Sequence, residues 1–166
     1  MFSLIELNDD NYEELSKLEI SEVQETYVLD FKKCIKYKEE NPFLKIYGIK
    51  MDNTYIGLTA FARWDSDESI PVINRWTWFD EFFLDLKYQH KGYGKILVPM
   101  ILEKIKNLYN PKFIVLSVKL GNTGAKKLYK ELGFVDTDLI YDEDLDQVRR
   151  KKKMDITDEE IMFYYC

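Results

Sequence analysis

Histidine and cysteine are scarce in this 166-residue chain, and their scarcity limits the chemistry open to it. His90 is the only histidine, so we expect neither a histidine-based catalytic triad nor a multi-histidine metal site. Cys34 and Cys166 are too few and too isolated for a disulfide framework or a zinc site. We therefore expect a protein without a bound metal.

Long apolar runs are also missing. No stretch approaches the ~18 apolar residues of a membrane-spanning helix. The N-terminus reaches Glu6 after a short apolar segment and has no basic region before it, so no signal peptide is evident. These absences predict a cytoplasmic protein with no membrane contact. No internal repeat or linker interrupts the chain.

Acidic residues outnumber basic ones, 30 to 24, which gives a net charge of −6 and a pI near 5.0. This charge argues against a nucleic-acid partner and suits a cationic one. The basic run 149–153 directly follows the acidic segment 142–146, so neutralisation across a hairpin, or protection of a sheet edge, explains it better than nucleic acid does. The length suits a single domain with a substantial core.

Hydrophobic periodicity predicts a mixed α/β chain. Helices are expected from a capping box at Asp10, over 22–28 after Ser21, from Asp30 to Asn41, over 92–109 with a bend at Pro99, and from Asn122 to Gly133. Strands are expected at 2–7, 43–50, 55–63, 75–84 and 112–118, with a final hairpin of 135–141 and 148–154. Residues 155–166 are expected to extend beyond a domain spanning 1–154, with a short helix over 157–166.

A glycine-containing loop, Gln89–Lys95, follows the aromatic strand and opens the long helix. Backbone N–H groups at a helix start converge with the positive end of its dipole, and this arrangement attracts anions. Gly92 and Gly94 allow positive φ and close approach, while Lys91 and Lys95 add positive charge. The spacing matches neither a P-loop nor a dinucleotide fingerprint, so we predict a different phosphate or pyrophosphate site.

A second stretch, Asn-Thr-Gly-Ala-Lys-Lys-Leu-Tyr-Lys-Glu-Leu-Gly-Phe (122–134), follows one strand later. In this order, Gln-x-x-Gly-x-Gly and Asn-x-x-Ala-x-x-Leu-Tyr-x-x-x-Gly-Phe resemble the GNAT family of N-acetyltransferases. Segments 20–27 and 79–85 resemble the bacterial spermine/spermidine acetyltransferases within it. The resemblance implies an α/β (α+β) GNAT fold, a mixed, mostly antiparallel twisted sheet of six to seven strands flanked by about four helices.

The resemblance also assigns roles in the site. Acetyl-CoA would be held by Phe82, Phe83 and Leu84 along the strand, by Gln89, His90, Lys91, Gly92, Tyr93, Gly94 and Lys95 in the loop, and by Asn122. Tyr129 matches the general acid that protonates the departing thiolate. Asp80 lies where the polyamine group places an acidic residue near the amine, and we choose it over Glu81 because strand alternation puts the two on opposite faces.

On the acceptor side, the resemblance places Glu25 and Tyr27, with Glu22, near the amine, although a solvated helix face explains them equally well. Asp65, Asp67 and Glu68 are expected to add acidic charge on the same side. Trp76 and Trp78 either line the acceptor groove or pack in the core. The expected reaction is direct acetyl transfer from acetyl-CoA to a primary amine in a ternary complex, with a polyamine such as spermidine or spermine as acceptor.

Other functions stay open at this point. The acceptor could be an aminoglycoside-like antibiotic or a protein N-terminus, or the chain could be a non-catalytic acetyl-CoA-binding regulatory module. The sequence does not fix the acetylated nitrogen or the oligomeric state, for which a homodimer is one expectation, or the role of residues 155–166.

Overall fold

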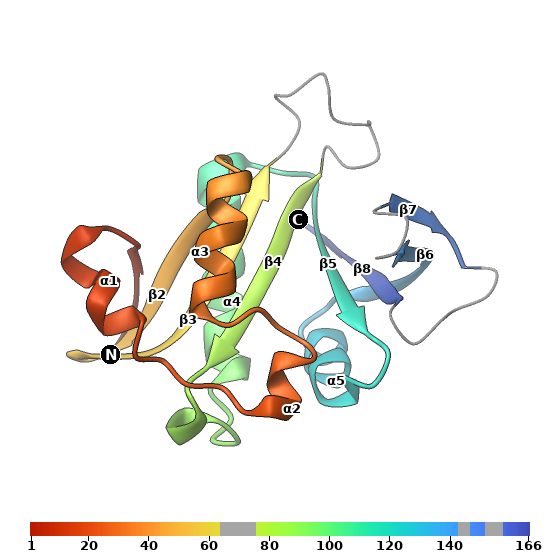
Figure 1. The fold of residues 1–166 in the computed structure, drawn as a ribbon. Helices are drawn as coiled ribbons and strands as arrows, with labels where there is room; N and C mark the ends of the chain where they lie inside the picture. Colours follow the sequence, from red (N-terminus) through yellow and green to blue (C-terminus); the bar gives the residue numbers. More distant parts are fainter. Residues whose placement is uncertain (64–75, 143–146, 152–157) are drawn as a thin grey trace. The chain divides into compact units, whose positions relative to one another are not determined.

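The computed structural model describes residues 1–63, 76–142, 147–151 and 158–166 (Figure 1). The chain forms two compact units. Residues 1–62 and 79–101 form the N-terminal unit, and residues 63–78 and 102–166 form the C-terminal unit. Two strands and one helix contain residues of both units, so the sequence order of the elements does not follow the division.

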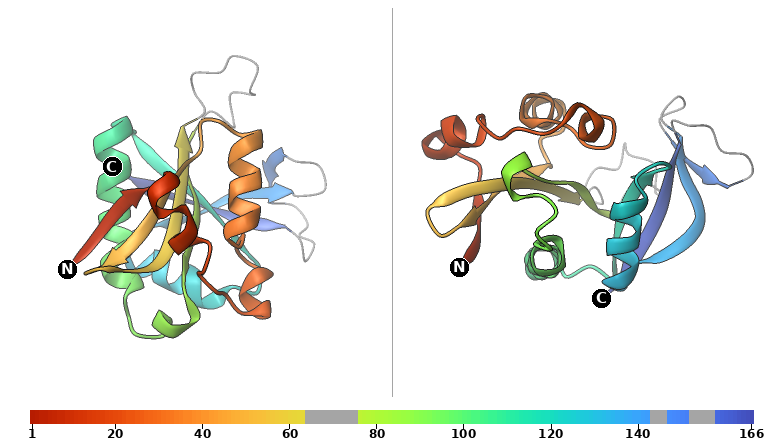
Figure 2. Two further views of the ribbon diagram at one scale, coloured as in Figure 1. Left: turned by 60° about the vertical axis from the view of Figure 1, so that its left-hand side comes forward. Right: turned by 90° about the horizontal axis from the view of Figure 1, so that it is seen from below.

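The N-terminal unit is a sheet with helices on both faces. Antiparallel strands β1 (Phe2–Glu6), β2 (Lys45–Met51) and β3 (Thr54–Arg63) are followed by most of β4 (Thr77–Leu84). Helices α1 (Asp9–Leu15), α2 (Glu22–Glu25) and α3 (Phe31–Glu40) lie on one face, and the first half of α4 (Gly94–Tyr109) lies on the other (Figures 1 and 2). A 3-10 turn, η2 (Leu86–Tyr88), joins β4 to the loop before α4.

Apolar residues from both helical layers close over this sheet. The expected stripe of α4 is buried at Leu97 and Ile101, and α3 buries Phe31 and Cys34. Strand β3 is buried on both faces, as a strand covered by helices on either side must be. The core therefore fixes β3, and with it the neighbouring strand β4 that leads to the predicted anion loop.

The C-terminal unit contains the rest of α4, helix α5 (Thr123–Glu131) and strands β5 (Phe113–Lys119), β6 (Val135–Asp142), β7 (Gln147–Arg150) and β8 (Glu159–Tyr165). The first residues of β4 pair in parallel with β5, at Thr77↔Ile114 and Trp78↔Val115. Strand β8 runs antiparallel to both β5 and β6, and β6 forms a hairpin with β7.

Strand pairing follows the order β1-β2-β3-β4-β5-β8-β6-β7. Within the described ranges the chain has eight strands and five α-helices, against the six to seven strands and about four helices expected. The mixed, mostly antiparallel α/β fold class is confirmed.

Two expectations about local structure are wrong. The first helix begins at Asp9 and not after Asp10, because Asn8 accepts hydrogen bonds from the N–H groups of Asp10 (2.9 Å) and Asn11 (3.3 Å). The amide of Asn11 completes the cap, since its Oδ1 accepts from Asn8 N at 2.9 Å. The capping box is therefore formed by Asn8 and Asn11, and not by the box that the sequence predicted at Asp10.

The second error concerns the C-terminus, where the expected helix over 157–166 is strand β8 instead. Its residues pair along their length with β5, from Lys119↔Glu159 to Phe113↔Tyr165, and β6 borders its other edge. Ile161 and Met162 are buried. Two neighbouring strands satisfy the backbone here, and this pairing outweighs the weak helical preference of a short segment.

The other caps are confirmed. Ser21, Asp30 and Asn122 accept hydrogen bonds from the N–H groups of Gln24, Lys33 and Ala125. Gly133 has a φ of +100° after α5, as a helix-ending glycine requires. Helix α4 continues through Pro99, and the bend there stays a prediction.

The basic run is neutralised as expected, as far as the structure describes it. Arg149 contacts Asp142 (2.6 Å) and Asp158 (3.0 Å), Arg150 contacts Asp138 (3.5 Å), and Lys151 contacts Glu160 (2.5 Å). These carboxylates lie on the neighbouring strands β6 and β8 or just before β8. Lys152 and Lys153 lie outside the described residues.

Candidate active site

The loop Gln89–Lys95 has the backbone shape of an anion site. His90 (φ 58°) and Gly92 (φ 78°) are left-handed, and Lys91 between them is not. Alternation of this kind turns successive N–H groups toward one concave side, forming a nest that binds anions. Gly92 supplies the positive φ expected of it. Gly94 is already the first residue of α4 and has no positive φ, so it contributes only the absence of a side chain.

The N–H groups of this loop are open to a ligand. The first bonds of α4 run from Lys95 N to Gly92 O (3.2 Å) and from Ile96 N to Tyr93 O (3.0 Å). Among the described residues, the N–H groups of Gly92, Tyr93 and Gly94 donate to no protein acceptor. A Cβ on Gly92 would meet no atom within 4 Å. Open donors, open space and the α4 dipole together fit a pyrophosphate group.

Side chains turned into the protein hold this loop in place. Gln89 Nε2 donates to Leu84 O (2.7 Å) and to Gln24 Oε1 on α2 (2.5 Å). The buried carboxylate of Asp85 accepts from the N–H groups of Lys87 and Glu19, both at 3.0 Å. Gln89 therefore uses its side chain for positioning, which leaves its backbone for the predicted contact with the donor.

Strand β4 presents the backbone predicted to hold the pantetheine arm. Asp85 N donates to Ile56 O of β3 at 2.9 Å, so by strand alternation Phe82 and Leu84 direct their backbone groups to the other edge. On the β3 side, a Cβ on Gly57 would lie 2.4 Å from Phe83 O. The glycine is therefore required for the approach of β3 to β4, although no sequence signal drew attention to it.

The predicted acceptor residues Glu25 and Tyr27 also belong to the N-terminal unit. Glu25 is exposed on α2 and lies 3.7 Å from Lys33 Nζ, while Tyr27 is half-buried after the helix. Leu29 N donates to Glu81 Oε2 at 3.2 Å, so Glu81 points toward the connection between α2 and α3. Asp65, Asp67 and Glu68, expected to add acidic charge, lie outside the described residues.

Asp80 and Glu81 differ in their surroundings. Asp80 is half-buried, and its Oδ2 atom is inaccessible to solvent. Burial raises the pKa of the Cys34 thiol, and the negative charges of Glu81, Asp30 and Asp80 raise it further. These acidic groups therefore share one region around α3. The choice of Asp80 as the residue beside the amine stays a prediction, with Glu81 as the alternative.

Asn122 and Tyr129 are carried by α5 in the C-terminal unit. The Asn122 side chain caps the helix through Ala125 N at 3.3 Å. The half-buried ring of Tyr129 packs edge-on against Phe134 (5.5 Å between centroids), and Phe134 packs against Tyr164 of β8 (5.3 Å). The aromatic residues after Tyr129 therefore fix the direction of its ring.

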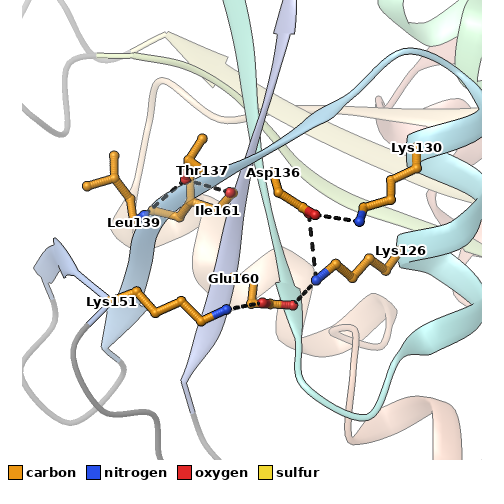
Figure 3. A network of polar contacts seen from close by, with 8 residues as sticks. All are labelled: Lys126, Lys130, Asp136, Thr137, Leu139, Lys151, Glu160 and Ile161. Atoms are coloured by element: carbon orange, nitrogen blue, oxygen red, sulfur yellow. Dashed lines mark hydrogen bonds and ion pairs between the residues drawn. The ribbon is translucent and has the colours of Figure 1, made fainter.

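An ionic network joins α5 to two strands (Figure 3). Lys126 contacts Glu160 of β8 and lies 3.6 Å from Asp136 of β6, and Lys130 also contacts Asp136. The Lys130 hydrogen bond lowers the pKa of Asp136. Burial acts to raise the pKa of Glu160, but Lys126 and Lys151 outweigh it, so this pKa is also below its ordinary value. The helix bearing Tyr129 is thus held by ion pairs on one side and by aromatic packing through Phe134.

Trp76 and Trp78 pack with other aromatic residues in the C-terminal unit. The Trp76 ring lies 5.2 Å from Phe163 and 6.0 Å from Phe113, and both tryptophans border the buried cluster around Val115. Core packing accounts for them. In the parts of the chain that the structure describes, no helix is long and apolar enough to cross a membrane, and no three His, Cys, Asp or Glu side chains gather as a metal site.

Comparison with known proteins agrees with this geometry. The acetyltransferase (GNAT) family model matches residues 4–134. The spermine/spermidine N(1)-acetyltransferase of Bacillus subtilis (strain 168) is 30% identical over 131 residues, which cover 77% of this chain and 84% of that protein. The probable spermine N(1)-acetyltransferase of Bacillus subtilis subsp. natto (strain BEST195) shows the same identity and coverage.

A solved structure shares the fold. The crystal structure of the Vibrio cholerae spermidine N-acetyltransferase in complex with CoA and spermine matches with a TM-score of 0.69 at 18% identity, covering 99% of this chain and 95% of that one. At this identity the likeness concerns the fold alone. The match of the family model over most of the chain shows more: the protein belongs to the GNAT family and is an acetyl-CoA-dependent N-acetyltransferase.

Proposed function

We propose that this protein acetylates a primary amine of a polyamine such as spermidine or spermine. The 30% identity with the Bacillus subtilis spermine/spermidine N(1)-acetyltransferase carries this proposal. The distribution of charge supports it, since the net charge is −6 and the N-terminal unit gathers Glu22, Glu25, Asp80 and Glu81 on α2 and β4. A flexible chain with several ammonium groups can contact more than one of these carboxylates.

On the donor side, the residues present fit acetyl-CoA, which supplies the acetyl group as a thioester. The nest at His90–Gly94 and the exposed side chains of Lys91 and Lys95 bind the pyrophosphate. Backbone N–H groups of Phe82 and Leu84, on the edge of β4 away from β3, hydrogen-bond the pantetheine arm and polarise the acetyl carbonyl.

On the acceptor side, Asp80 attracts the ammonium group and takes its proton, directly or through a water molecule. The hydroxyl of Tyr129 gives its proton to the leaving sulfur. Burial raises the pKa of both the Cys34 and Cys166 thiols, which disfavours the reactive thiolate form. The transfer therefore runs directly from donor to amine, without an acyl-cysteine.

A panel of amines tests the proposal. The purified protein is mixed with acetyl-CoA and spermidine, spermine, a monoamine of similar length, an aminoglycoside or a peptide with a free N-terminus, and products are identified by mass spectrometry. We expect kcat/KM to be highest for the polyamines and to fall as salt rises, because the steering is screened over ~8 Å at physiological ionic strength.

Three results would argue against the proposal. Equal activity on mono- and polyamines without salt dependence removes the polyamine assignment, and preferential acetylation of the aminoglycoside or peptide replaces it. Binding of acetyl-CoA without transfer to any amine favours a regulatory module. Asp80→Asn should lower kcat more than Glu81→Gln does, and the reverse order would move the proton acceptor to Glu81.

A cytoplasmic location and a homodimer also belong to this proposal. Light scattering on the purified protein measures the oligomeric state, and a monomer at micromolar concentration would rule out a stable dimer.

A further inference from the structure

The short helix α2 is connected to the donor loop by a side-chain hydrogen bond between Gln24 and Gln89. Gln89 Nε2 has two hydrogens, and it donates one to Leu84 O (2.7 Å) and one to Gln24 Oε1 (2.5 Å). The Leu84 carbonyl can only accept, so it fixes which end of the Gln89 amide faces inward. Gln24 then meets this donor with its own carbonyl oxygen, so both hydrogens of the Gln89 amide have an acceptor.

A second set of bonds joins Glu19, three residues before α2, to the turn between β4 and the loop. Glu19 N donates to Asp85 Oδ2, and Leu86 N donates to Glu19 O, both at 3.0 Å. After α2, Leu29 N donates to Glu81 of β4. The chain is therefore fixed to β4 and its following turn on either side of α2, and the Gln24–Gln89 bond adds a contact from α2 itself to the anion loop.

Gln24 is linked to the anion loop through the position of Gln89 in the sequence. Gln89 immediately precedes His90, the first left-handed residue of the nest. An anion held by the N–H groups of Gly92 to Gly94 restrains the backbone between His90 and α4 and so restrains Gln89. The restraint passes to α2, which carries Glu22 and Glu25, two of the predicted acceptor residues.

We propose that Gln24 is a positioning residue that couples binding of the CoA donor to binding of the polyamine. The proposal rests on the polyamine function proposed above. Donor binding adds to the restraint on Gln89, whose bond to Gln24 holds α2 with Glu22 and Glu25 in place, so less ordering of the helix is left for the polyamine to supply. Coupling between two sites is reciprocal, so the polyamine tightens CoA binding by the same factor.

The expected size follows from a single hydrogen bond. A net contribution of ~1 kcal/mol corresponds to about a fivefold change in affinity, within the range of measured couplings. We therefore expect spermidine to bind about fivefold more tightly in the presence of saturating CoA than in its absence. Removal of the Gln24 carbonyl should abolish most of this factor.

Calorimetry on the whole chain measures the coupling factor between the two ligands, with CoA as the non-reacting donor and spermidine as the acceptor. Gln24→Met keeps the length and helix preference of the side chain but cannot accept the Gln89 hydrogen bond. Gln24→Glu keeps an acceptor and should retain the coupling. Val23→Ala is the matched control, because the Val23 side chain on the same helix is 68% exposed.

In Gln24→Met we expect the coupling factor to approach one, with the affinity for CoA alone unchanged and the KM for spermidine raised more than kcat is lowered. Val23→Ala should behave like the wild type. Circular dichroism melts confirm that each variant is folded, so that a change in coupling is not a general loss of structure.

Two results separate the coupling from the function on which it rests. If the wild type acetylates spermidine but shows the same coupling factor as Gln24→Met, or no coupling, the role of Gln24 is refuted and the polyamine function stands. If the wild type binds CoA but neither binds nor acetylates spermidine, the polyamine function fails and the coupling fails with it.

Discussion

Replacing Gly57 by alanine tests how strictly the structure positions the edge of β4. A Cβ at this position would lie 2.4 Å from Phe83 O, 2.8 Å from Leu84 Cδ2 and 3.1 Å from Leu84 Cα. The nearest atom belongs to the backbone, so no side-chain rotation relieves the clash. Strand β4 must move away from β3 by roughly 1 Å before the contact becomes ordinary for packed atoms.

The magnitude combines two opposing effects. Overpacking of a buried site costs about 1–3 kcal/mol, whereas the lower entropy of the unfolded alanine chain returns about 0.4–1 kcal/mol. We expect a net destabilisation of about 1–2 kcal/mol, which lowers Tm by roughly 2–8 °C for a chain of this size. Displacement of Phe83 and Leu84 by about 1 Å should also lower kcat by up to ~10²-fold, because the backbone groups of Phe82 and Leu84 form the predicted donor-binding edge and move with this segment.

Gly124→Ala is the matched control. A Cβ there would meet no atom within 4 Å, and the position lies in the first turn of α5, where alanine is the better helix former by about 1 kcal/mol. Thermal melts should therefore show a lower Tm for Gly57→Ala and a higher Tm for Gly124→Ala, and acetylation assays on both variants measure kcat. A Gly57→Ala protein with wild-type Tm and wild-type kcat would refute the argument that β3 fixes the active edge of β4.

Three further predictions concern the donor loop and α5. Gly94→Val should weaken acetyl-CoA binding by about tenfold, the equivalent of one lost hydrogen bond to a charged group, in a protein that still folds, and unchanged affinity by calorimetry would remove the pyrophosphate assignment. Tyr129→Phe should lower kcat by roughly 10²-fold with little change in acetyl-CoA affinity, and a near-normal kcat with chemistry rate-limiting would leave the hydroxyl without a catalytic role. Glu160 has a pKa below its ordinary value of 4.5, so its stabilising effect is complete above that value and is lost as the pH falls through the lowered one. Urea melts should therefore show Glu160→Gln about 1 kcal/mol less stable than the wild type at pH 7 and closer to it at pH 3, and an equal deficit at both pH values would contradict the ion-pair explanation.

The sequence by itself determined the features that depend on near neighbours in the chain. A helix cap needs one side chain and an N–H group two or three residues away, so Ser21, Asp30 and Asn122 were readable as caps. A helix-ending turn needs a left-handed residue, which Gly133 supplies. Gly92 likewise indicated the bend of the anion loop. The motif of this loop and the motif that contains Tyr129 indicated the family, because each motif is a short pattern of neighbouring residues.

Tertiary structure alone decided the features that depend on partners far along the chain. Residues 159–165 became β8 because β5 and β6 leave a place between them, and no property of the isolated segment reveals those neighbours. Gly57 matters only because β4 approaches it, and Gln24 meets Gln89, which is 65 positions further along the chain. His90 takes a left-handed conformation that sequence reasoning assigned to glycine, since the surrounding turn fixes its backbone. Such contacts form between distant segments. The packing and hydrogen-bond energy that favours them is available only when folding brings those segments together.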